Sequence, residues 1–278
     1  MDKGDKMIDL VLIDIDGTLM NDEKTIPEEN IQAIEWLLSK NIPVTLVTGR
    51  SYHTCLDVID KLKEDVPVVF QNGALIYQPY SGKILRQVFL SEHIVKEVIG
   101  YTNHMQNRIL YLNSLHQEDM WTISPYKGPY EIYFQRNSTR VRMVNDFLSL
   151  PLHEVTEIVL LDSEKEIQKA IHPLVKNYSG LFSPIKSFEI QDEIFFEVFG
   201  QDVSKGKAAQ FLADYFHVSL QNTLFIGDSY NDEEIMELVG YPVAMGNAVE
   251  EVKTKARMIT KTNNEAGVAW AIHELIKN

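Results

Sequence analysis

The run Ile8–Ile13 leads directly into Asp14-Ile15-Asp16-Gly17-Thr18, and this junction constrains the fold more than any other segment of the chain. A short apolar run is typical of a strand buried in a parallel sheet, so the two aspartates lie at its carboxyl end. Gly17 favours a turn there that presents both carboxylates around one site. Two anions buried together repel each other unless a cation or a proton compensates them, and a divalent metal is the simplest such cation.

This segment alone leaves a second interpretation open. Asp14 and Asp16 could merely end a strand and begin a turn, as Asp-Gly sequences often do. The choice between the two interpretations depends on the rest of the chain.

Strand-like and helix-like segments alternate in the first part of the chain, over residues 8–13, 28–40, 43–47, 52–63 and 66–70. This βαβαβ order predicts a parallel sheet. Regular alternation returns near the end, with helices over 205–215, 232–239, 249–253 and 265–276 and strands over 223–226, 242–244 and 257–259. The later segments therefore complete the sheet that the first segments begin.

Between these two parts the pattern changes to mixed helices and antiparallel strands. Asn72-Gly73 is a strong hairpin signal, and residues 74–78 and 83–89 follow it as two antiparallel strands. We expect further helices over 92–105, 139–148 and 164–177 and further strands over 108–113, 157–161, 187–190 and 195–199. The pattern predicts an inserted α+β domain over 83–201, between two core segments, 1–82 and 202–278.

An aromatic-rich stretch lies within the predicted insertion, at Trp121, Tyr126, Tyr130 and Tyr133. These side chains could line a ligand pocket, because such pockets are rich in aromatic groups. Packing in the core or on the surface is the alternative, since aromatic side chains bury large apolar areas.

Composition narrows the class of protein. The 40 acidic and 26 basic residues give a net charge of −14, and no basic cluster offers a nucleic-acid surface. No apolar stretch is long enough to span a membrane, and the first residues lack the apolar segment of a signal peptide, so we expect a cytoplasmic protein. The single Cys55 cannot form an intramolecular disulfide, and we expect a buried thiol rather than a nucleophile.

Three further segments fall where predicted strands end or helices begin, the places at which open α/β sheets bind ligands. Thr48-Gly49-Arg50 offers a hydroxyl and open backbone amides suited to phosphate oxygens, although an ordinary turn with a threonine cap would look the same. Ser204-Lys205-Gly206-Lys207 could bring a lysine into the cleft, although solvated lysines are the usual outcome. Gly227-Asp228-Ser229-Tyr230-Asn231-Asp232 adds two acids and an amide, in what could also be only a turn.

The four segments, in this order and at these separations, resemble the haloacid dehalogenase-like superfamily, and in particular its Cof-type phosphatases with a class IIB cap. Met245-Gly246-Asn247-Ala248 matches a further segment of that family. The resemblance spans nearly the whole chain and implies a Rossmann-like parallel sheet core with an inserted α+β cap domain. Within the cap, the match rests mainly on length and on the types of element.

The resemblance also implies a role for each site residue. Asp14 is then the nucleophile that accepts the phosphoryl group, and Asp16 is the acid that protonates the leaving oxygen and afterwards activates water. Mg²⁺ is held by an Asp14 oxygen, the backbone carbonyl of Asp16, and Asp228. Asp232 orients Lys205 or a metal-bound water. The implied phosphate-binding groups are Thr48, Lys205, Asn231 and the backbone amides of Ile15 and Gly49.

These roles predict a Mg²⁺-dependent phosphatase that acts on a small phosphorylated metabolite, such as a sugar, polyol or nucleotide phosphate. A phosphomutase that uses the same intermediate, or a regulator that only binds a phosphorylated ligand, remains an alternative. A dinucleotide-dependent oxidoreductase fits less well, because the first strand leads into Asp-Ile-Asp-Gly-Thr rather than a glycine-rich turn. No nucleic acid, membrane or obligate protein partner is expected.

Overall fold

The computed structural model describes residues 8–62, 66–112, 115 and 118–276. The chain forms two compact units, which we call the core unit and the cap unit. The core unit comprises Met1–Arg50, Cys55–Arg86 and Ser204–Asn278, and the cap unit comprises Ser51–Thr54 and Gln87–Val203. The expected helix end at residue 63 and the expected strand end at residue 113 lie outside the described residues.

The core unit is built on a five-stranded parallel sheet with the order β14-β13-β12-β1-β2. Its central strand β1 (Leu10–Ile13) is completely buried, which agrees with its uniformly apolar sequence. The neighbouring strands are β2 (Val44–Leu46), β12 (Thr223–Gly227), β13 (Tyr241–Ala244) and β14 (Met258–Ile259). The parallel sheet predicted from the alternating pattern is therefore confirmed.

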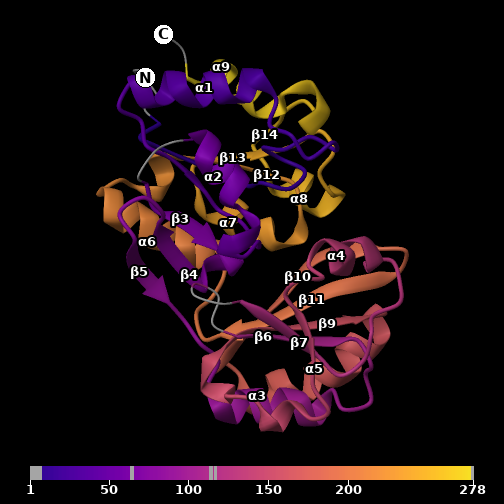
Figure 1. Cartoon of the computed structure of the whole chain (residues 1–278). Coiled ribbons are helices and arrows are strands. Elements are labelled where there is room, and N and C mark those ends of the chain that lie inside the picture. Colours follow the sequence, from indigo (N-terminus) through magenta and orange to yellow (C-terminus); the bar gives the residue numbers. More distant parts are fainter. Residues whose placement is uncertain (1–7, 63–65, 113–114, 116–117, 277–278) are drawn as a thin grey trace. The chain divides into compact units, whose positions relative to one another are not determined.

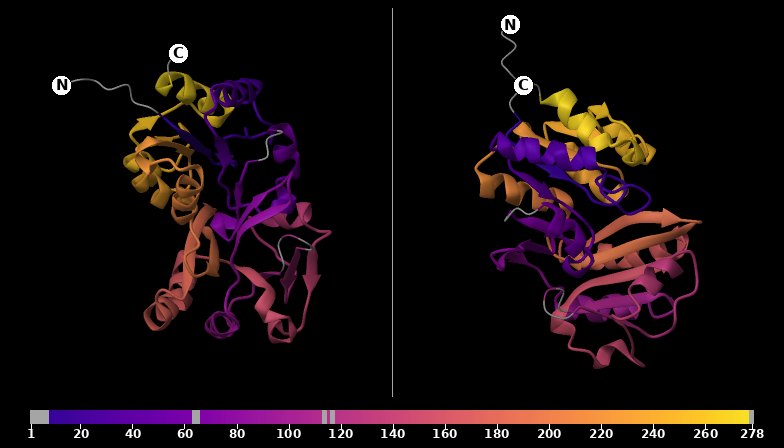
Figure 2. Two further views of the ribbon diagram at one scale, coloured as in Figure 1. Left: turned by 90° about the vertical axis from the view of Figure 1, so that its left-hand side faces the viewer. Right: turned by 45° about the horizontal axis from the view of Figure 1, so that its top comes forward.

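Helices cover both faces of this sheet (Figure 1). On one face, α1 (Glu28–Ser39) packs against α9 (Gly267–Leu275), and both views of Figure 2 show these segments from opposite ends of the chain side by side. On the other face lie α6 (Lys205–Phe216) and α7 (Glu233–Leu238), and α7 packs against α8 (Glu250–Lys255). Helix α2 (Leu56–Leu62) follows a short 3₁₀ turn, and the thiol of Cys55 before it is buried.

The strand β3 (Val68–Phe70) differs from the prediction. It pairs antiparallel with β4 (Leu75–Gln78) in a small sheet of order β3-β4-β5, and one isolated parallel bridge, Val47 to Val69, connects it to the end of β2. The chain reverses after β3 because Gln71 and Asn72 both adopt left-handed backbone conformations. Since β5 (Lys83–Gln87) belongs to this small sheet, the core continues through Arg86 rather than ending at residue 82.

The cap unit has a six-stranded sheet of order β10-β11-β9-β6-β7-β8, in which only β7 and β8 pair in parallel. Helices α3 (Glu92–Tyr101) and α5 (Glu164–Tyr178) pack on one face over a large apolar cluster. The strands are β6 (Arg108–Leu112), β7 (Asp119–Thr122), β8 (Val141–Met143), β9 (Val155–Asp162), β10 (Phe182–Ile190) and β11 (Glu193–Gly200). This mixture of helices and antiparallel strands is the α+β arrangement that the sequence predicts.

The helix predicted over 139–148 is wrong. Residues Val141–Met143 form the edge strand β8, which pairs with β7 through Met120 and Val141, and Phe147–Ser149 form a 3₁₀ turn after Asp146. The helix of this region comes earlier, at α4 (Glu131–Arg136). Pairing with β7, a contact that local pattern does not reveal, outweighs the helical signal of this segment.

The aromatic stretch packs inside the cap unit. Tyr126 stacks on Phe134 with ring centres 4.5 Å apart and donates a hydrogen bond to Glu193 Oε1 at 3.0 Å. Tyr130 is 2 % exposed and donates to the Glu193 backbone oxygen at 2.6 Å. For these two tyrosines the structure agrees with the packing alternative rather than with a pocket lining. No helix in the described part of the chain is both long and apolar enough to cross a membrane.

Candidate active site

The first and fourth predicted motifs meet because their strands are neighbours. Strands β1 and β12 run parallel with Ile13 opposite Ile226, so Asp14 and Asp228 leave adjacent strand ends. The backbone N–H of Asp14 also donates to the Ile226 oxygen at 3.0 Å. Asp14, Asp228 and Asp232 each place one carboxylate oxygen within 4.8 Å of the others. The carboxyl edge of the sheet thus gathers three acids whose positions in the sequence are far apart.

Lys205 is the buried cation of this cluster. Its Nζ donates to Asp14 Oδ1 at 2.7 Å and to Asp232 Oδ1 at 2.6 Å, and only 1 % of its side chain is exposed. Burial alone lowers the pKa of a lysine, but the two carboxylates outweigh burial and leave the pKa of Lys205 raised. The solvated lysine that such a helix start usually carries is therefore not what the structure shows. Ser204 caps α6 by accepting a hydrogen bond from the Lys207 amide, which places Lys205 in the first turn.

Asp232 holds the loop that carries Asp228. Its Oδ2 accepts hydrogen bonds from the backbone amides of Asp228 and Ser229 at 2.8 and 3.0 Å, while its Oδ1 accepts from Lys205. A side chain on Gly227 would overlap this carboxylate, because an added Cβ would lie 2.7 Å from Asp232 Cγ. Asp232 therefore orients Lys205 and the backbone of the loop, which leaves Asp14 and Asp228 freer to hold a metal.

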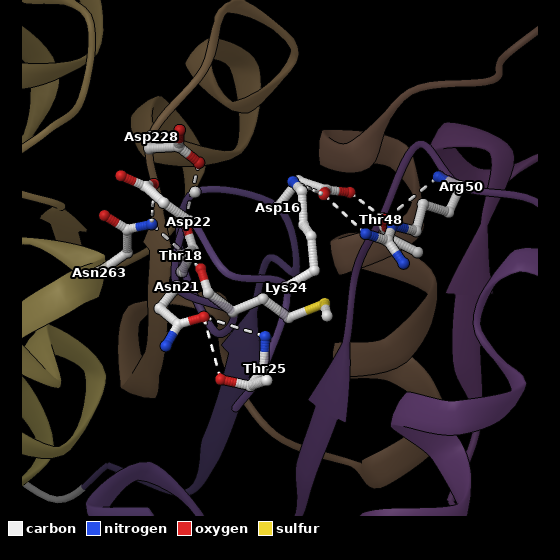
Figure 3. Close-up of polar contacts among 12 residues, drawn as sticks. Asp16, Thr18, Asn21, Asp22, Lys24, Thr25, Thr48, Arg50, Asp228 and Asn263 are labelled. Atoms are coloured by element: carbon white, nitrogen blue, oxygen red, sulfur yellow. Dashed lines mark hydrogen bonds and ion pairs between the residues drawn. The ribbon is translucent and has the colours of Figure 1, made fainter. Parts of the chain in front are cut away.

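The turn after Asp14 is fastened to the same loop. Thr18 Oγ1 donates to Asp228 Oδ1 at 2.8 Å, as Figure 3 shows, and Asn247 Nδ2 donates to the Gly17 oxygen at 2.8 Å. Gly17 itself has φ +72°, a conformation that glycine adopts readily. The Met-Gly-Asn-Ala segment thus contributes one residue, Asn247, that supports the turn after Asp14.

We expect Gly17→Ala to impair the site more than an ordinary turn substitution. An added Cβ would lie 2.9 Å from Asp228 Cγ and closer still to one of its oxygens, and the backbone would be strained at its positive φ. The Asp228 carboxylate would then have to leave its present position. Gly82→Ala is the matched control, because Gly82 has a similar φ of +70° and its nearest neighbour, the Tyr77 hydroxyl, is 3.8 Å away. Mg²⁺ titration of both variants, followed by calorimetry, tests this, and equal Mg²⁺ affinity in the two variants would contradict it.

The titration behaviour of the cluster fits a divalent metal. Burial and the charge of Asp232 together raise the pKa of Asp14 to about 7, against the lowering effect of Lys205. Burial and the charges of Asp14 and Asp232 likewise raise the pKa of Asp228. Carboxylate oxygens are the ligands that Mg²⁺ prefers, and a dication would relieve the repulsion that raises both pKa values. The residues present therefore fit the expected metal.

Asp16 lies apart from the acidic cluster and is held by two cations (Figure 3). Arg50 donates from Nε to Asp16 Oδ2 at 2.5 Å and from Nη2 to Oδ1 at 2.7 Å, and Lys24 Nζ donates to Oδ1 at 3.0 Å. Partial burial raises the pKa of Asp16, but the hydrogen bonds and charges of Arg50 and Lys24 outweigh it and lower the pKa to about 2. Asp16 is thus ionised and oriented in this structure.

The two residues that hold Asp16 received no role from the sequence. Arg50 belongs to the Thr-Gly-Arg segment, but its pairing with Asp16 depends on how the chain folds between these two residues. Lys24 has φ +60° in a turn that Asn21 closes by accepting hydrogen bonds from the Thr25 amide and hydroxyl at 2.9 and 3.1 Å. In the sequence, the turn-forming residues Asn21 and Asp22 indicate the turn that carries Lys24.

Three of the expected phosphate-binding groups, Thr48, Gly49 and Asn231, lie around the end of β2. Thr48 is buried, and its hydroxyl oxygen accepts a hydrogen bond from the Arg50 amide at 3.1 Å, which is the capping arrangement considered for this turn. Gly49 lies beside Asn231, because a Cβ at Gly49 would be 3.4 Å from Asn231 Nδ2. Asn231 Nδ2 in turn donates to Asn72 Oδ1 at 2.9 Å. Asn72, which the sequence indicated only as a hairpin residue, therefore joins this group, while the phosphate role of the Ile15 amide stays a prediction.

Fold and site together define a mixed α/β protein with a Rossmann-like core, an aspartate cluster at the carboxyl edge of its sheet, and an inserted α+β cap. The chain belongs to the haloacid dehalogenase-like hydrolase family, whose sequence pattern matches residues 11–272. This membership confirms the resemblance found in the motifs.

Individual relatives agree with this assignment. The chain is 28 % identical to M6_Spy0533 of Streptococcus pyogenes, with 98 % of this chain and 99 % of the relative covered. It is also 28 % identical to YcsE of Bacillus subtilis, a 5-amino-6-(5-phospho-D-ribitylamino)uracil phosphatase, with 97 % and 96 % covered. Among solved structures, the subclass IIB sugar phosphatase BT4131 superposes with a TM-score of 0.81 at 21 % identity, with 96 % of this chain and 99 % of that chain covered, and so has the same fold.

Proposed function

We propose that this protein is a Mg²⁺-dependent phosphatase that hydrolyses a small phosphorylated metabolite through a phosphorylated Asp14. The observation that carries the proposal is the buried contact of Asp14 with Lys205, beside Asp228 and Asp232, at the end of the central strand. A carboxylate held there by a cation is oriented to attack, and the same cation can neutralise an arriving phosphate.

In the first step an Asp14 oxygen attacks phosphorus, the bond between phosphorus and the ester oxygen breaks, and Asp16 supplies a proton to the departing oxygen. In the second step water attacks the phosphorus of phospho-Asp14, Asp16 takes the proton of that water, and the bond between phosphorus and the Asp14 oxygen breaks, which releases inorganic phosphate and restores the Asp14 carboxylate. Thr48, Lys205, Asn231 and the amides of Ile15 and Gly49 hold the phosphoryl oxygens in both steps. Mg²⁺, held by Asp14, the Asp16 carbonyl and Asp228, would offset the repulsion between the anionic nucleophile and the anionic ester.

The surroundings of Asp16 suit one of its two roles directly. With a pKa of about 2 it is ionised, so it can accept the proton of the attacking water. To donate a proton in the first step it must first take one up. A bound phosphate ester raises the pKa of a neighbouring carboxyl because it adds negative charge next to it and offsets Arg50 and Lys24.

Hydroxylated metabolites are the substrate class that we propose. YcsE acts on a phosphorylated ribityl chain and BT4131 on sugar phosphates, by their names, and both align over nearly the whole chain. The ester is expected to be that of a primary alcohol on such a polyol. A phosphomutase on the same intermediate would return an isomeric ester instead of inorganic phosphate.

The proposal is tested by assaying the purified protein, stripped of metal by a chelator, against sugar, polyol and nucleotide phosphates. We expect no release of phosphate without metal, recovery with Mg²⁺, and inhibition by Ca²⁺, whose larger and looser coordination sphere misplaces the nucleophile. The same protein assayed with monovalent salt of equal ionic strength is the control. Hydrolysis that survives complete removal of metal would refute the metal dependence, and an isomeric ester as the product would favour the mutase.

A further inference from the structure

The segment Ser51–Thr54 follows the Thr-Gly-Arg motif directly, yet it belongs to the cap unit. Arg50 before it and Cys55 after it belong to the core unit. The peptide bond between Arg50 and Ser51 therefore joins a residue that holds Asp16 to a residue that the cap holds.

The cap holds Ser51 through a buried carboxylate. Ser51 Oγ donates to Glu118 Oε2 at 2.6 Å, and Arg140 Nη1 pairs with that same oxygen and lies 3.3 Å from Ser51 Oγ. The Glu118 side chain is completely buried, and within the described part of the chain nothing hydrogen-bonds its other oxygen, Oε1. Glu118 is thus fixed through one oxygen, which Ser51 and Arg140 share.

Arg140 is itself fixed within the cap. Its Nη2 donates to Asn137 Oδ1 at 2.5 Å, and Asn137 ends helix α4, where its Nδ2 donates to the Tyr133 oxygen at 2.8 Å. Burial raises the pKa of Glu118, against the lowering effects of Arg140 and Ser51, so the carboxylate depends on these two partners. A side chain anchored in this way positions whatever it binds.

In the core unit, hydrogen bonds hold the backbone of Arg50 in place. Its N–H donates to Thr48 Oγ1 at 3.1 Å, and its oxygen accepts from the Gln71 amide at 2.9 Å. The direction of the guanidinium toward Asp16 then depends on the backbone at the Arg50–Ser51 junction. The residue that bonds to the cap carboxylate, Ser51, directly follows the residue that makes two hydrogen bonds to Asp16, Arg50.

We propose that Ser51, Glu118 and Arg140 are positioning residues, which fix the backbone after Arg50 and thereby keep its guanidinium aligned on Asp16. This inference rests on the proposed function, since it assigns a consequence to the acid role of Asp16. The competing explanation is that the three residues only stabilise the cap.

The test uses substituted phenyl phosphates, from 2,4-dinitrophenyl to unsubstituted phenyl phosphate. Proton donation matters little when the leaving group departs easily and much when it departs poorly. The quantity measured is kcat/KM, because it reports only the steps up to departure of the leaving group. We expect Ser51→Ala to lose about tenfold with phenyl phosphate, a modest loss for a displaced catalytic group, and almost nothing with the dinitrophenyl ester.

Three further variants sharpen this test. Ser51→Thr keeps the hydroxyl and should restore the phenyl phosphate rate. Ser149→Ala is the matched control, because it removes an exposed cap hydroxyl that donates locally to the Asp146 backbone oxygen, at 2.7 Å. In an Asp16→Asn background, Ser51→Ala should cause no additional loss, since the group it positions is already gone.

An equal loss along the whole ester series would overturn the inference, because it would indicate weakened phosphate binding or a cap that is merely unstable. A faster reaction with phenyl phosphate would also overturn it, because Arg50 would then restrain Asp16 instead of aligning it. Amide hydrogen exchange gives a readout independent of activity. Ser51→Ala should speed exchange at Gln71, whose N–H bonds to the Arg50 oxygen, and unchanged exchange there would refute the positioning even if no phosphate ester were a substrate.

Discussion

Asp14→Asn is expected to abolish turnover of every phosphate ester, with a loss on the order of 10⁴-fold or more in kcat. An amide oxygen does not form the acyl phosphate, and no later step compensates for a missing nucleophile. The fold should survive, because asparagine has nearly the same shape and Lys205 keeps its second partner, Asp232 Oδ1, at 2.6 Å.

The control for this change is Asp57→Asn, the same substitution at an exposed position in α2. It should leave turnover unchanged. Mass spectrometry of acid-quenched wild-type enzyme should find the phosphoryl group on Asp14. A phosphoryl group on any other residue, or an Asp14→Asn variant with wild-type turnover, would disprove the assigned nucleophile.

The fold class was predictable because each central strand of the core is a short apolar run that is buried on both faces. Strand β1 is the clearest case, since its four residues are completely buried. Pairing was less predictable. Strand β3 reads like its neighbours in the sequence, but the left-handed residues Gln71 and Asn72 redirect the chain into a hairpin. The edge strand β8 depends on β7 for its conformation, and a local pattern carries no information about that partner.

The site shows the same division. Asp14, Asp228 and Thr48 could be placed because parallel strands bring their carboxyl ends to one edge. The partners of Asp16 could not be placed from the sequence. Lys24 contacts Asp16 from a turn with positive φ, and the long Arg50 side chain could pair with any of several acids. The link from Ser51 to Glu118 joins residues 67 positions apart and depends on the register of the cap sheet.

Lys205→Met is expected to lower the free energy of unfolding by about 3–5 kcal/mol at neutral pH in the absence of divalent metal. The substitution removes the buried cation between Asp14 and Asp232 but keeps most of the side-chain volume. The two carboxylates, with Asp228 beside them, then lack their compensating charge. Denaturant unfolding in the presence of a chelator measures the change.

The loss should depend on pH in a defined direction. The folded-state pKa of Asp14 is already raised to about 7, above its value in the unfolded chain, and removal of Lys205 raises it further. Between the pKa of Asp14 in the unfolded chain and its raised pKa in the folded variant, the folded state binds more protons than the unfolded state. The free energy of unfolding therefore falls as pH rises through this range. The variant should therefore be most stable near pH 4 to 5, and its deficit against the wild type should grow through neutral pH.

Mg²⁺ should recover part of the deficit, because it supplies to the same carboxylates the charge that Lys205 no longer supplies, and a ligand that binds only the folded state stabilises it. Lys207→Met, two residues along α6 at an exposed position, is the matched control and should change neither the stability nor its response to Mg²⁺. A Lys205→Met variant as stable as the wild type at every pH would show that the three acids are protonated in the folded protein and need no cation. The proposed nucleophile would then be neutral at rest, and the buried lysine would have no electrostatic role in holding it.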